Sequence, residues 1–285
     1  MLQDTIFFGN VFDILTHYSS VSSLYCLCKN KIKYKGIYLI HIIMDVYFFQ
    51  IGSHIGNTVN DHIFSKEIKN KNIVLIEPVP YYFQKLQENY AEKSKNNNIT
   101  YMNVAVSNSS ELHSSEFLAN ISALQPSMLV SNFDSTLDLY VPSLDNDFSQ
   151  FPPWASQLSS CVENHIPIHC PNLKIEKITV PCYRIGTIIH DMSINHIEFL
   201  LVDTEGHDYD ILMDLDLGVI KPTHIIFENK HMDGVCCRGE KYRELMARFA
   251  DAGYRVFSED GEDTHLIMHR SVFGAYGSEN TRFVV

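Results

Sequence analysis

The chain has 285 residues, of which 45% are hydrophobic and 20% are charged, and its mean hydropathy is -0.08. This composition is typical of a globular protein with one large core, or with one domain and an appendage. The net charge of -12 disfavours a surface that follows the phosphates of a nucleic acid, so we do not expect a nucleic acid as substrate.

Cysteine usage and hydropathy indicate the compartment. The seven cysteines include no Cys-x-x-Cys pair, which argues against a compact zinc site and favours reduced thiols. Residues 1–14 contain acidic side chains and lack the basic start of a secretory signal. The apolar run at 36–51 is interrupted by His41 and Asp45 and is shorter than the ~20 residues that a membrane span needs. We therefore expect a protein of the cytoplasm (the host cytoplasm if viral) without a membrane span.

The first 45 residues precede the regular pattern. Their apolar residues recur at helical spacing, and basic residues follow from Lys29 to Lys35. We expect a helical N-terminal extension at 1–45, made of two or three short helices that cover one edge of the next domain. The open alternative is a surface that binds a protein partner.

From residue 46 onward, strand patterns alternate with helical patterns. This order predicts an α/β fold with a parallel, Rossmann-like sheet and right-handed crossovers. Strands are expected at 46–51, 73–77, 99–106, 177–180, 197–203 and 224–228, with a final hairpin-like pair at 254–258 and 264–268. Helices are expected at 57–69, 81–93, 185–192 and 239–251.

The alternation stops between 107 and 172, where Ser, Asn, Asp and Pro are frequent. A long stretch without secondary structure inside a domain is usually a functional lid. This one contains the single tryptophan and a group of polar residues that includes His165 and His169. We predict an insertion that covers an acceptor site, with a passive surface loop as the alternative. The substrate-binding candidates are Trp154, Gln157 and Ser160.

The strand at 46–51 ends at Gly52, and a second glycine follows at Gly56. Glycine tolerates positive φ and lets a ligand approach the backbone. A dinucleotide site would need glycine where this chain has His54, because a side chain there would crowd a pyrophosphate. A ligand with a ribose but no phosphate fits the spacing better, and S-adenosylmethionine is the commonest such ligand. Glu77 ends the next strand, where a carboxylate can accept hydrogen bonds from ribose hydroxyls.

Together, the blocks at 49–57, 76–78, 103–106 and 201–212 resemble the FkbM-type family of S-adenosylmethionine-dependent methyltransferases. The last block is the most distinctive, because a hydrophobic strand runs into Asp-x-Glu-Gly there. The resemblance covers about 46–270. It implies a seven-stranded methyltransferase sheet with helices on both faces, in a domain that we place at 46–285. Family members methylate hydroxyls of sugars, glycolipids and polyketide-like products.

The resemblance also implies roles for individual residues. The turn after the first strand would cradle the methionine part of the cofactor, Glu77 would bind the ribose, and Asn103 would border the adenine. The family usually has aspartate where this chain has Gln50, so a charge that faces the cofactor's ammonium group is lost here. The implied cofactor-binding residues are Gln50, Gly52, Ser53, His54, Ile55, Gly56, Asn57, Glu77, Pro78, Asn103, Val104 and Asp203.

Methyl transfer to a hydroxyl needs an in-line nucleophile, and a base within hydrogen-bond reach helps because alcohols are poor nucleophiles at neutral pH. Acids and histidines follow two successive strands of this chain. The catalytic candidates are Asp203, Glu205, His207, Glu228 and His231, and Lys230 is a candidate for binding the acceptor. Two alternatives stay open: Asp203 capping a helix, and histidines that occupy an ordinary loop or first helical turn.

A divalent cation on Asp203, Glu205 and Glu228 is a further alternative. No His-x-His or His-Glu-x-x-His spacing occurs, however, and we expect no metal site.

The sequence therefore predicts an S-adenosylmethionine-dependent O-methyltransferase that acts on a hydroxyl of a sugar, glycan or other small molecule. The alternative is a catalytically weak or inactive protein of the same fold that recruits a partner through its N-terminal helices. Gln50 favours this alternative, whereas Glu77 and the Asp203-x-Glu205-Gly206 motif oppose it. The net charge disfavours an RNA methyltransferase.

Overall fold

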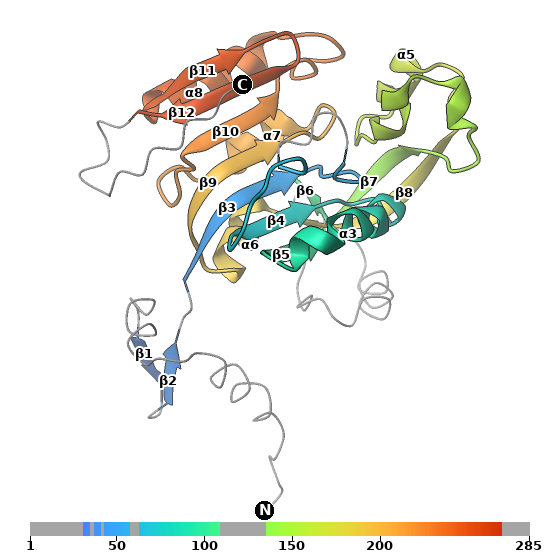
Figure 1. The fold of residues 1–285 in the computed structure, drawn as a ribbon. Coiled ribbons are helices and arrows are strands. Elements are labelled where there is room, and N and C mark those ends of the chain that lie inside the picture. The colour runs from blue at the N-terminus through green and yellow to red at the C-terminus, as the bar shows by residue number, and fades with distance from the viewer. Residues whose placement is uncertain (1–30, 35–36, 41–42, 58–62, 109–134, 270–285) are drawn as a thin grey trace, which may run out of the picture. The chain divides into compact units, whose positions relative to one another are not determined.

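The computed structural model describes residues 31–34, 37–40, 43–57, 63–108 and 135–269, and the chain divides into two units, 1–44 and 45–285 (Figure 1). In the first unit, strands β1 (Lys31–Tyr34) and β2 (Ile37–Ile40) pair in antiparallel fashion. The sequence predicts helices throughout 1–45, but these described residues are strands, and residues 1–30 lie outside the described part. The alternation of Lys and Ile at 31–33 has the two-residue period of a strand.

The second unit contains a seven-stranded sheet in the order β11-β12-β10-β9-β3-β4-β5. Strands β3, β4 and β5 are parallel, β9 is parallel to β10, and β12 runs antiparallel to both β10 and β11. The predicted α/β, Rossmann-like seven-stranded sheet is thereby confirmed. Its strands are β3 (Met44–Ile51), β4 (Asn72–Ile76), β5 (Asn98–Met102), β9 (Ile194–Val202), β10 (His224–Glu228), β11 (Tyr254–Glu259) and β12 (Asp263–Met268).

Helices cover both faces of this sheet. Neighbouring residues of a strand point to opposite faces, so Ile226 and Phe227 of β10 mark the two faces. Helix α3 (Pro80–Ser94) buries Leu86 and Tyr90 in a cluster that includes Ile226. Helix α8 (Glu240–Asp251) packs on the other face, where the ring of Phe249 lies 6.4 Å from that of Phe227. Two further helices, α6 (Ile185–Asp191) and α7 (Asp208–Asp214), contact each other, and α7 contacts α8 (Figure 1).

Two predicted elements differ from the structure. The helix expected at 57–69 is absent from the described residues of that range, where 63–65 form a turn and 67–69 have no regular structure. Asn, Asp, Ser and β-branched residues are weak helix formers, and Ile63 is buried in the core from a non-helical backbone. The strand expected at 99–106 divides into β5 and β6 (Ala105–Val106), because β6 pairs with a strand of a different sheet.

That second sheet has three strands in the order β6-β8-β7. Its longer members, β7 (Ser135–Pro142) and β8 (Ile175–Tyr183), pair along their whole length, so β8 extends beyond the predicted 177–180. The prediction of a structureless segment at 107–172 is therefore wrong: besides β7, the segment contains η1 (Phe148–Gln150), η2 (Pro153–Gln157) and α5 (His165–His169). Residues 109–134 lie outside the described part.

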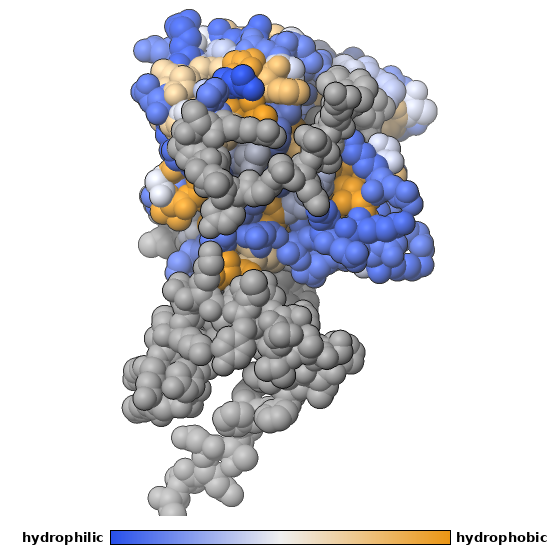
Figure 2. All heavy atoms as spheres, turned by 60° about the vertical axis from the view of Figure 1, so that its left-hand side comes forward, coloured by the Kyte–Doolittle hydropathy of each residue, from blue (hydrophilic) through white to orange (hydrophobic). Residues whose placement is uncertain are grey.

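On the face that Figure 2 shows, the described residues of the second unit that are visible are mainly hydrophilic, with smaller hydrophobic patches. Strand β11 forms one edge of the seven-stranded sheet and exposes two large apolar side chains, Val256 and Phe257. Single exposed apolar residues of this kind are normal for a globular fold and need no partner to explain them. The polar side chains that could bind a ligand or take part in a reaction lie instead at the carboxyl ends of the parallel strands.

Candidate active site

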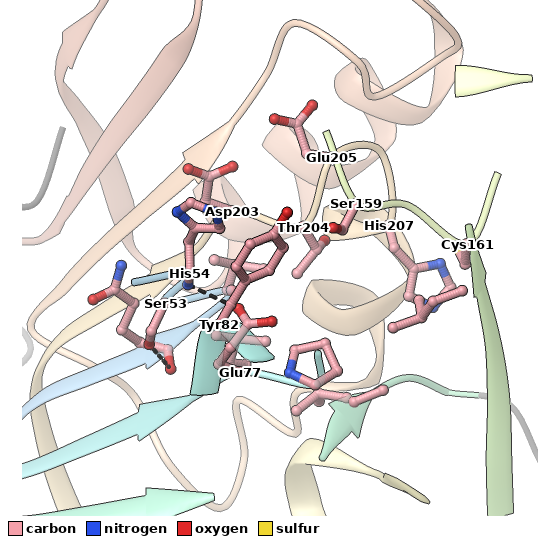
Figure 3. A pocket seen from close by; sticks show the side chains of 18 of the residues that line it. Ser53, His54, Glu77, Tyr82, Ser159, Cys161, Asp203, Thr204, Glu205 and His207 are labelled. Atoms are coloured by element: carbon pink, nitrogen blue, oxygen red, sulfur yellow. Dashed lines mark hydrogen bonds between the residues drawn. The ribbon is translucent and has the colours of Figure 1, made fainter. Parts of the chain in front are cut away.

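A pocket that is open to solvent lies at the carboxyl ends of β3, β4 and β9 (Figure 3). This is the edge of an open α/β sheet at which ligands bind. The turns that follow these strands supply its polar lining, and β7 contributes the apolar residues Leu137 and Leu139. The predicted site residues that line the pocket are Gln50, Gly52, Ser53, His54, Glu77, Pro78, Val104, Gln157, Asp203, Glu205 and His207.

The turn after β3 is held between two neighbouring strands. The amides of Gly52 and Ser53 both donate to the Ile76 carbonyl, at 3.0 and 2.9 Å, and the Asp203 amide donates to the Ile51 carbonyl at 3.0 Å. Gly52 has φ +84°, and a Cβ at this position would lie 1.8 Å from the Asp203 carbonyl oxygen. Glycine is thus required here by the close approach of the turn after β9.

Glu77 follows β4 and is buried at the floor of the pocket. Its Oε1 accepts a hydrogen bond from the Val79 amide and its Oε2 one from the His54 amide, both at 2.8 Å. Burial raises the pKa of Glu77 to about 7, while the two backbone donors act in the opposite direction. Each oxygen keeps a lone pair that can accept from a ligand hydroxyl.

His54 lies beside Glu77 with a left-handed backbone (φ 46°). Its ring centroid is 4.3 Å from that of Tyr82, and its Nε2 lies 3.2 Å from the Ser156 carbonyl. Burial lowers the pKa of His54 to about 4, so the ring is neutral at physiological pH. Because a carbonyl can only accept, Nε2 carries the proton and Nδ1 is an acceptor. This buried Nδ1 has no hydrogen-bond partner among the described residues, and the same holds for Oε1 of Gln50.

Carboxyl groups crowd together near the turn after β9. Burial and the neighbouring Glu205 raise the pKa of Asp203, and burial raises the pKa of Asp208. Asp208 is held by the Thr204 hydroxyl at 2.7 Å and by the amides of Thr204 and Glu228. Asp208 is buried, whereas Asp203 is exposed to the water of the pocket. Solvation of Asp203 therefore opposes part of the rise in its pKa. Such a cluster favours bound cations and carboxyl groups that share protons.

Glu205 lies at the rim, with its carboxylate directed away from Glu77 (Figure 3). Its backbone is left-handed (φ 53°), an unusual conformation for a residue other than glycine. Its Oε2 lies 2.8 Å from Nε2 of His165, and its carbonyl accepts from the Ser160 hydroxyl at 2.7 Å. The strained backbone and two fixed contacts orient this carboxylate at the entrance of the pocket.

His207 is also held in place, with its Nε2 2.8 Å from the Ser107 hydroxyl and its Nδ1 3.6 Å from Asp210. Burial lowers its pKa. Glu228 and His231 lie behind Glu205 and do not line the pocket, although Nε2 of His231 is 3.5 Å from Glu228 and 3.9 Å from Glu205.

The remaining predicted residues lie outside the pocket lining in other roles. Gly56 packs against α3, where a Cβ would lie 2.4 Å from Cδ1 of Leu86. The side-chain amide of Asn103 donates to the backbone carbonyls of Glu77 and Pro78 and so fixes the end of β4. Trp154 is 44% exposed, and Lys230 pairs with Glu262 at 3.4 Å. Ile55, Asn57 and Ser160 also lie outside the lining.

Several lining residues were not predicted. Tyr82 reaches the pocket from α3, and Leu137 and Leu139 come from β7, a strand hidden in a polar segment. The alternating Leu137, Leu139 and Val141 carried the only sequence signal for that strand. Ser159, Cys161, Thr204 and Asp263 also line the pocket.

A Rossmann-like seven-stranded sheet with a ligand pocket at its carboxyl edge is the architecture of a methyltransferase domain. The family described as "Methyltransferase FkbM domain" matches residues 50–256, and the chain belongs to this family. No curated protein matches the sequence.

Two solved structures are similar to this chain. Methyltransferase FkbM from Methylobacillus flagellatus KT shares 14% identity with a TM-score of 0.40, over 81% of this chain and 45% of that chain. The fibrillarin pre-rRNA processing protein of Methanococcus jannaschii shares 11% identity with a TM-score of 0.34, over 79% and 67%. The chain therefore spans less than half the length of the first of these structures.

The described residues contain no helix that is both long enough and apolar enough to cross a membrane.

Proposed function

We propose that this chain is an S-adenosylmethionine-dependent O-methyltransferase that acts on a hydroxyl of a sugar, glycan or other small molecule. The observation that carries the proposal is Glu77, a buried carboxylate at the tip of β4 whose two oxygens are fixed by backbone amides at the pocket floor. A carboxylate held in this way is suited to accept both hydroxyls of a ribose.

The chemistry of the neighbouring donor set fits the rest of the cofactor. Oε1 of Gln50 and Nδ1 of His54 are buried acceptors that lack a partner among the described residues. An ammonium group has three N–H donors and no acceptor, so it can satisfy such atoms. Apolar side chains such as Val104 and Leu137 supply walls suited to an adenine ring. When bound, the cofactor supplies a methyl group on a positively charged sulfur.

The acceptor half of the site follows from Glu205. Its carboxylate lies at the rim, oriented by His165, and can take the proton of an acceptor hydroxyl as the oxygen attacks the methyl carbon in line. Asp203 and Asp263 line the same pocket, and a cationic methyl donor bound beside them would favour their ionised forms. Lys230, Trp154, Gln157 and Ser160 remain candidates for contacts to the acceptor, of which Gln157 lines the pocket.

Calorimetric titration of the purified protein with S-adenosylmethionine and S-adenosylhomocysteine tests the proposal. We expect micromolar binding to the wild type and at least about tenfold weaker binding to Glu77→Ala, since a hydrogen bond to a charged group contributes about 1.5–3 kcal/mol. Glu67→Ala is the matched control, because that carboxylate is exposed and, among the described residues, pairs with Lys69 at the surface. A wild type that binds neither compound, or a Glu77→Ala variant that binds as well as the control, would contradict the proposal. Transfer of a labelled methyl group to glycan acceptors would then identify the substrate.

A further inference from the structure

Three histidines meet behind the pocket, next to two glutamates. The rings of His165, His169 and His231 have pairwise centroid distances of 4.8 Å, and one ring nitrogen of each lies within 4.8 Å of the others. His231 also lies within that distance of carboxylate oxygens of Glu205 and Glu228. We refer to these five residues as the histidine–glutamate cluster.

We propose that the histidine–glutamate cluster binds one divalent first-row transition-metal ion through imidazole nitrogens and carboxylate oxygens. The residues come from three separate parts of the chain: α5, the turn after β9, and the end of β10 with the segment that follows it. Two pairs have local spacings, His165-x-x-x-His169 and Glu228-x-x-His231, and the fold brings these pairs together with Glu205.

Burial is the first reason for this assignment. The side chains of His165 and His231 are only 2% and 3% exposed, and the surface of Glu228 is 9% exposed. Buried polar side chains are normally paired with protein groups or bound to metals, and the neutral imidazole is the form that ligates a metal.

Unsatisfied atoms are the second reason. Nε2 of His169 and Oε2 of Glu228 are buried and have no hydrogen-bond partner among the described residues. Leaving a buried polar atom unpaired costs about 1–3 kcal/mol. These atoms belong to two groups of ligand atoms, one with three histidines and one with two glutamates and a histidine, which share His231, and a single cation satisfies both atoms when the two groups contract around it.

The donor set selects the type of ion. Mg²⁺ and Ca²⁺ prefer all-oxygen sites, whereas imidazole nitrogens mixed with carboxylate suit zinc, iron, manganese or cobalt. Ligand atoms around a tetrahedral zinc ion lie about 3.3 Å apart, so the cluster must contract slightly when it binds one. The present contacts are already close to that scale, with Glu205 2.8 Å from His165 and Glu228 3.5 Å from His231.

His231 must also change its proton position. Its Nδ1 accepts from the Cys236 amide at 3.1 Å, so in the metal-free protein the proton lies on Nε2, which faces the glutamates. An imidazole that ligates through Nε2 carries its proton on Nδ1, which cannot face an amide N–H. We therefore expect metal binding to turn the Cys236 amide away, a movement of an exposed residue that already has a left-handed backbone (φ 52°).

The position of the cluster suggests what the ion would do. Glu205 belongs both to the cluster and to the rim of the pocket, so a bound ion would lie next to the acceptor half. A metal ion lowers the pKa of a bound hydroxyl and makes it a better nucleophile. This role rests on the proposed methyl transfer, whereas metal binding itself does not.

Titration of the full chain, freed of metal by a chelator, with zinc tests the inference. We expect one zinc per chain by calorimetry and elemental analysis, no comparable binding of Mg²⁺, and at least about a 100-fold loss of zinc affinity in His169→Ala and in Glu228→Gln. His190→Ala is the matched control, because that histidine is 89% exposed and its ring pairs with Asp191 in the part of the chain that the structure describes. Cobalt provides a second readout, with an absorption spectrum typical of nitrogen and oxygen ligands.

Three results would overturn the inference: a wild type that binds no zinc, a His169→Ala variant that binds like His190→Ala, or a cobalt spectrum with a thiolate band. The last would assign the metal to exposed cysteines such as Cys236 and Cys237. Calorimetry with S-adenosylmethionine on the same metal-free protein separates the two proposals. If zinc binds and the cofactor does not, the proposed function fails and the metal site stands; the reverse outcome removes the metal site alone.

Discussion

Glu77 occupies an environment that only a carboxyl group satisfies. Each of its oxygens receives one backbone N–H, from His54 and from Val79. A glutamine at this position would direct its NH₂ group against one of these donors, so the isosteric amide is a poor replacement. The residue therefore links the conformation of the turn after β3 to the recognition of the ligand.

The raised pKa of Glu77 predicts opposite effects of pH on binding and on stability. Because the folded value of about 7 lies above the ordinary 4.5, the folded state holds the proton more tightly than the unfolded state does. In the unliganded protein, this group therefore contributes its full stabilisation below pH 4.5, and the contribution is lost as the pH rises towards about 7. Affinity for S-adenosylmethionine should change the other way, because only the ionised carboxylate accepts fully from both ribose hydroxyls.

Urea unfolding between pH 4.5 and about pH 7, and calorimetry between about pH 6 and about pH 8, check this prediction. We expect cofactor affinity to rise by roughly tenfold across this interval in the wild type, since one unit of pKa corresponds to about 1.4 kcal/mol. The Glu77→Ala variant should lose most of this dependence. Equal pH profiles in the two proteins would show that another group controls binding.

At the scale of elements, the turn after β3 is defined by its contact with the turn after β9. We predict that Gly52→Ala destabilises the fold by about 3 kcal/mol or more, because a methyl group would lie 1.8 Å from the Asp203 carbonyl and φ is +84°. Chemical denaturation measures the change. Gly186→Ala serves as the control: that glycine lies in α6, where an added Cβ would meet no atom within 4 Å, so alanine should stabilise the helix by up to about 1 kcal/mol. A Gly52→Ala variant as stable as the wild type would mean that the two turns are not held together.

Sequence patterns predicted the buried parallel strands and missed what depends on distant partners. Strand β4 and helix α3 have strong local periodicity, and their predicted ends fall within a residue of those observed. Strand β7 lacks such a signal, because its polar neighbours hide three alternating apolar residues, and it is held by its pairing with β8 and by a bridge from Tyr140 to Ser160. The helix expected at 57–69 does not form in the described residues 63–69, where Ile63 is buried in the core from a non-helical backbone.

The candidate site likewise contains residues that the strand pattern predicts and contacts that it does not. Gly52, Glu77 and Asp203 each follow a strand directly, so the strand pattern alone predicts that they meet at one edge of the sheet. The pairing of Glu205 with His165 joins residues 40 positions apart through a segment of weak pattern. No local rule could have predicted that contact.

At the scale of the whole molecule, the chain consists of two units, with the boundary at residues 44 and 45. We predict that a protein beginning at residue 43 folds cooperatively and binds S-adenosylmethionine as the full chain does, because β3 and its pairing with β4 are retained. The contacts that Asp45 makes with Asn72 and Asn195 are retained as well. Thermal unfolding and calorimetry of the two proteins test this. A loss of cofactor affinity greater than about tenfold would assign residues 1–42 to the function of the second unit.

The approach of Gly52 to the carbonyl of Asp203 has a consequence for protein engineering. The turn that holds the proposed methyl donor and the turn that begins the acceptor half are joined backbone to backbone, with no side chain between them. A chimera that exchanges only one of the two turns with another family member would combine two turns whose backbones do not fit together. Acceptor preference should therefore be transferred from one family member to another only when both turns are exchanged together.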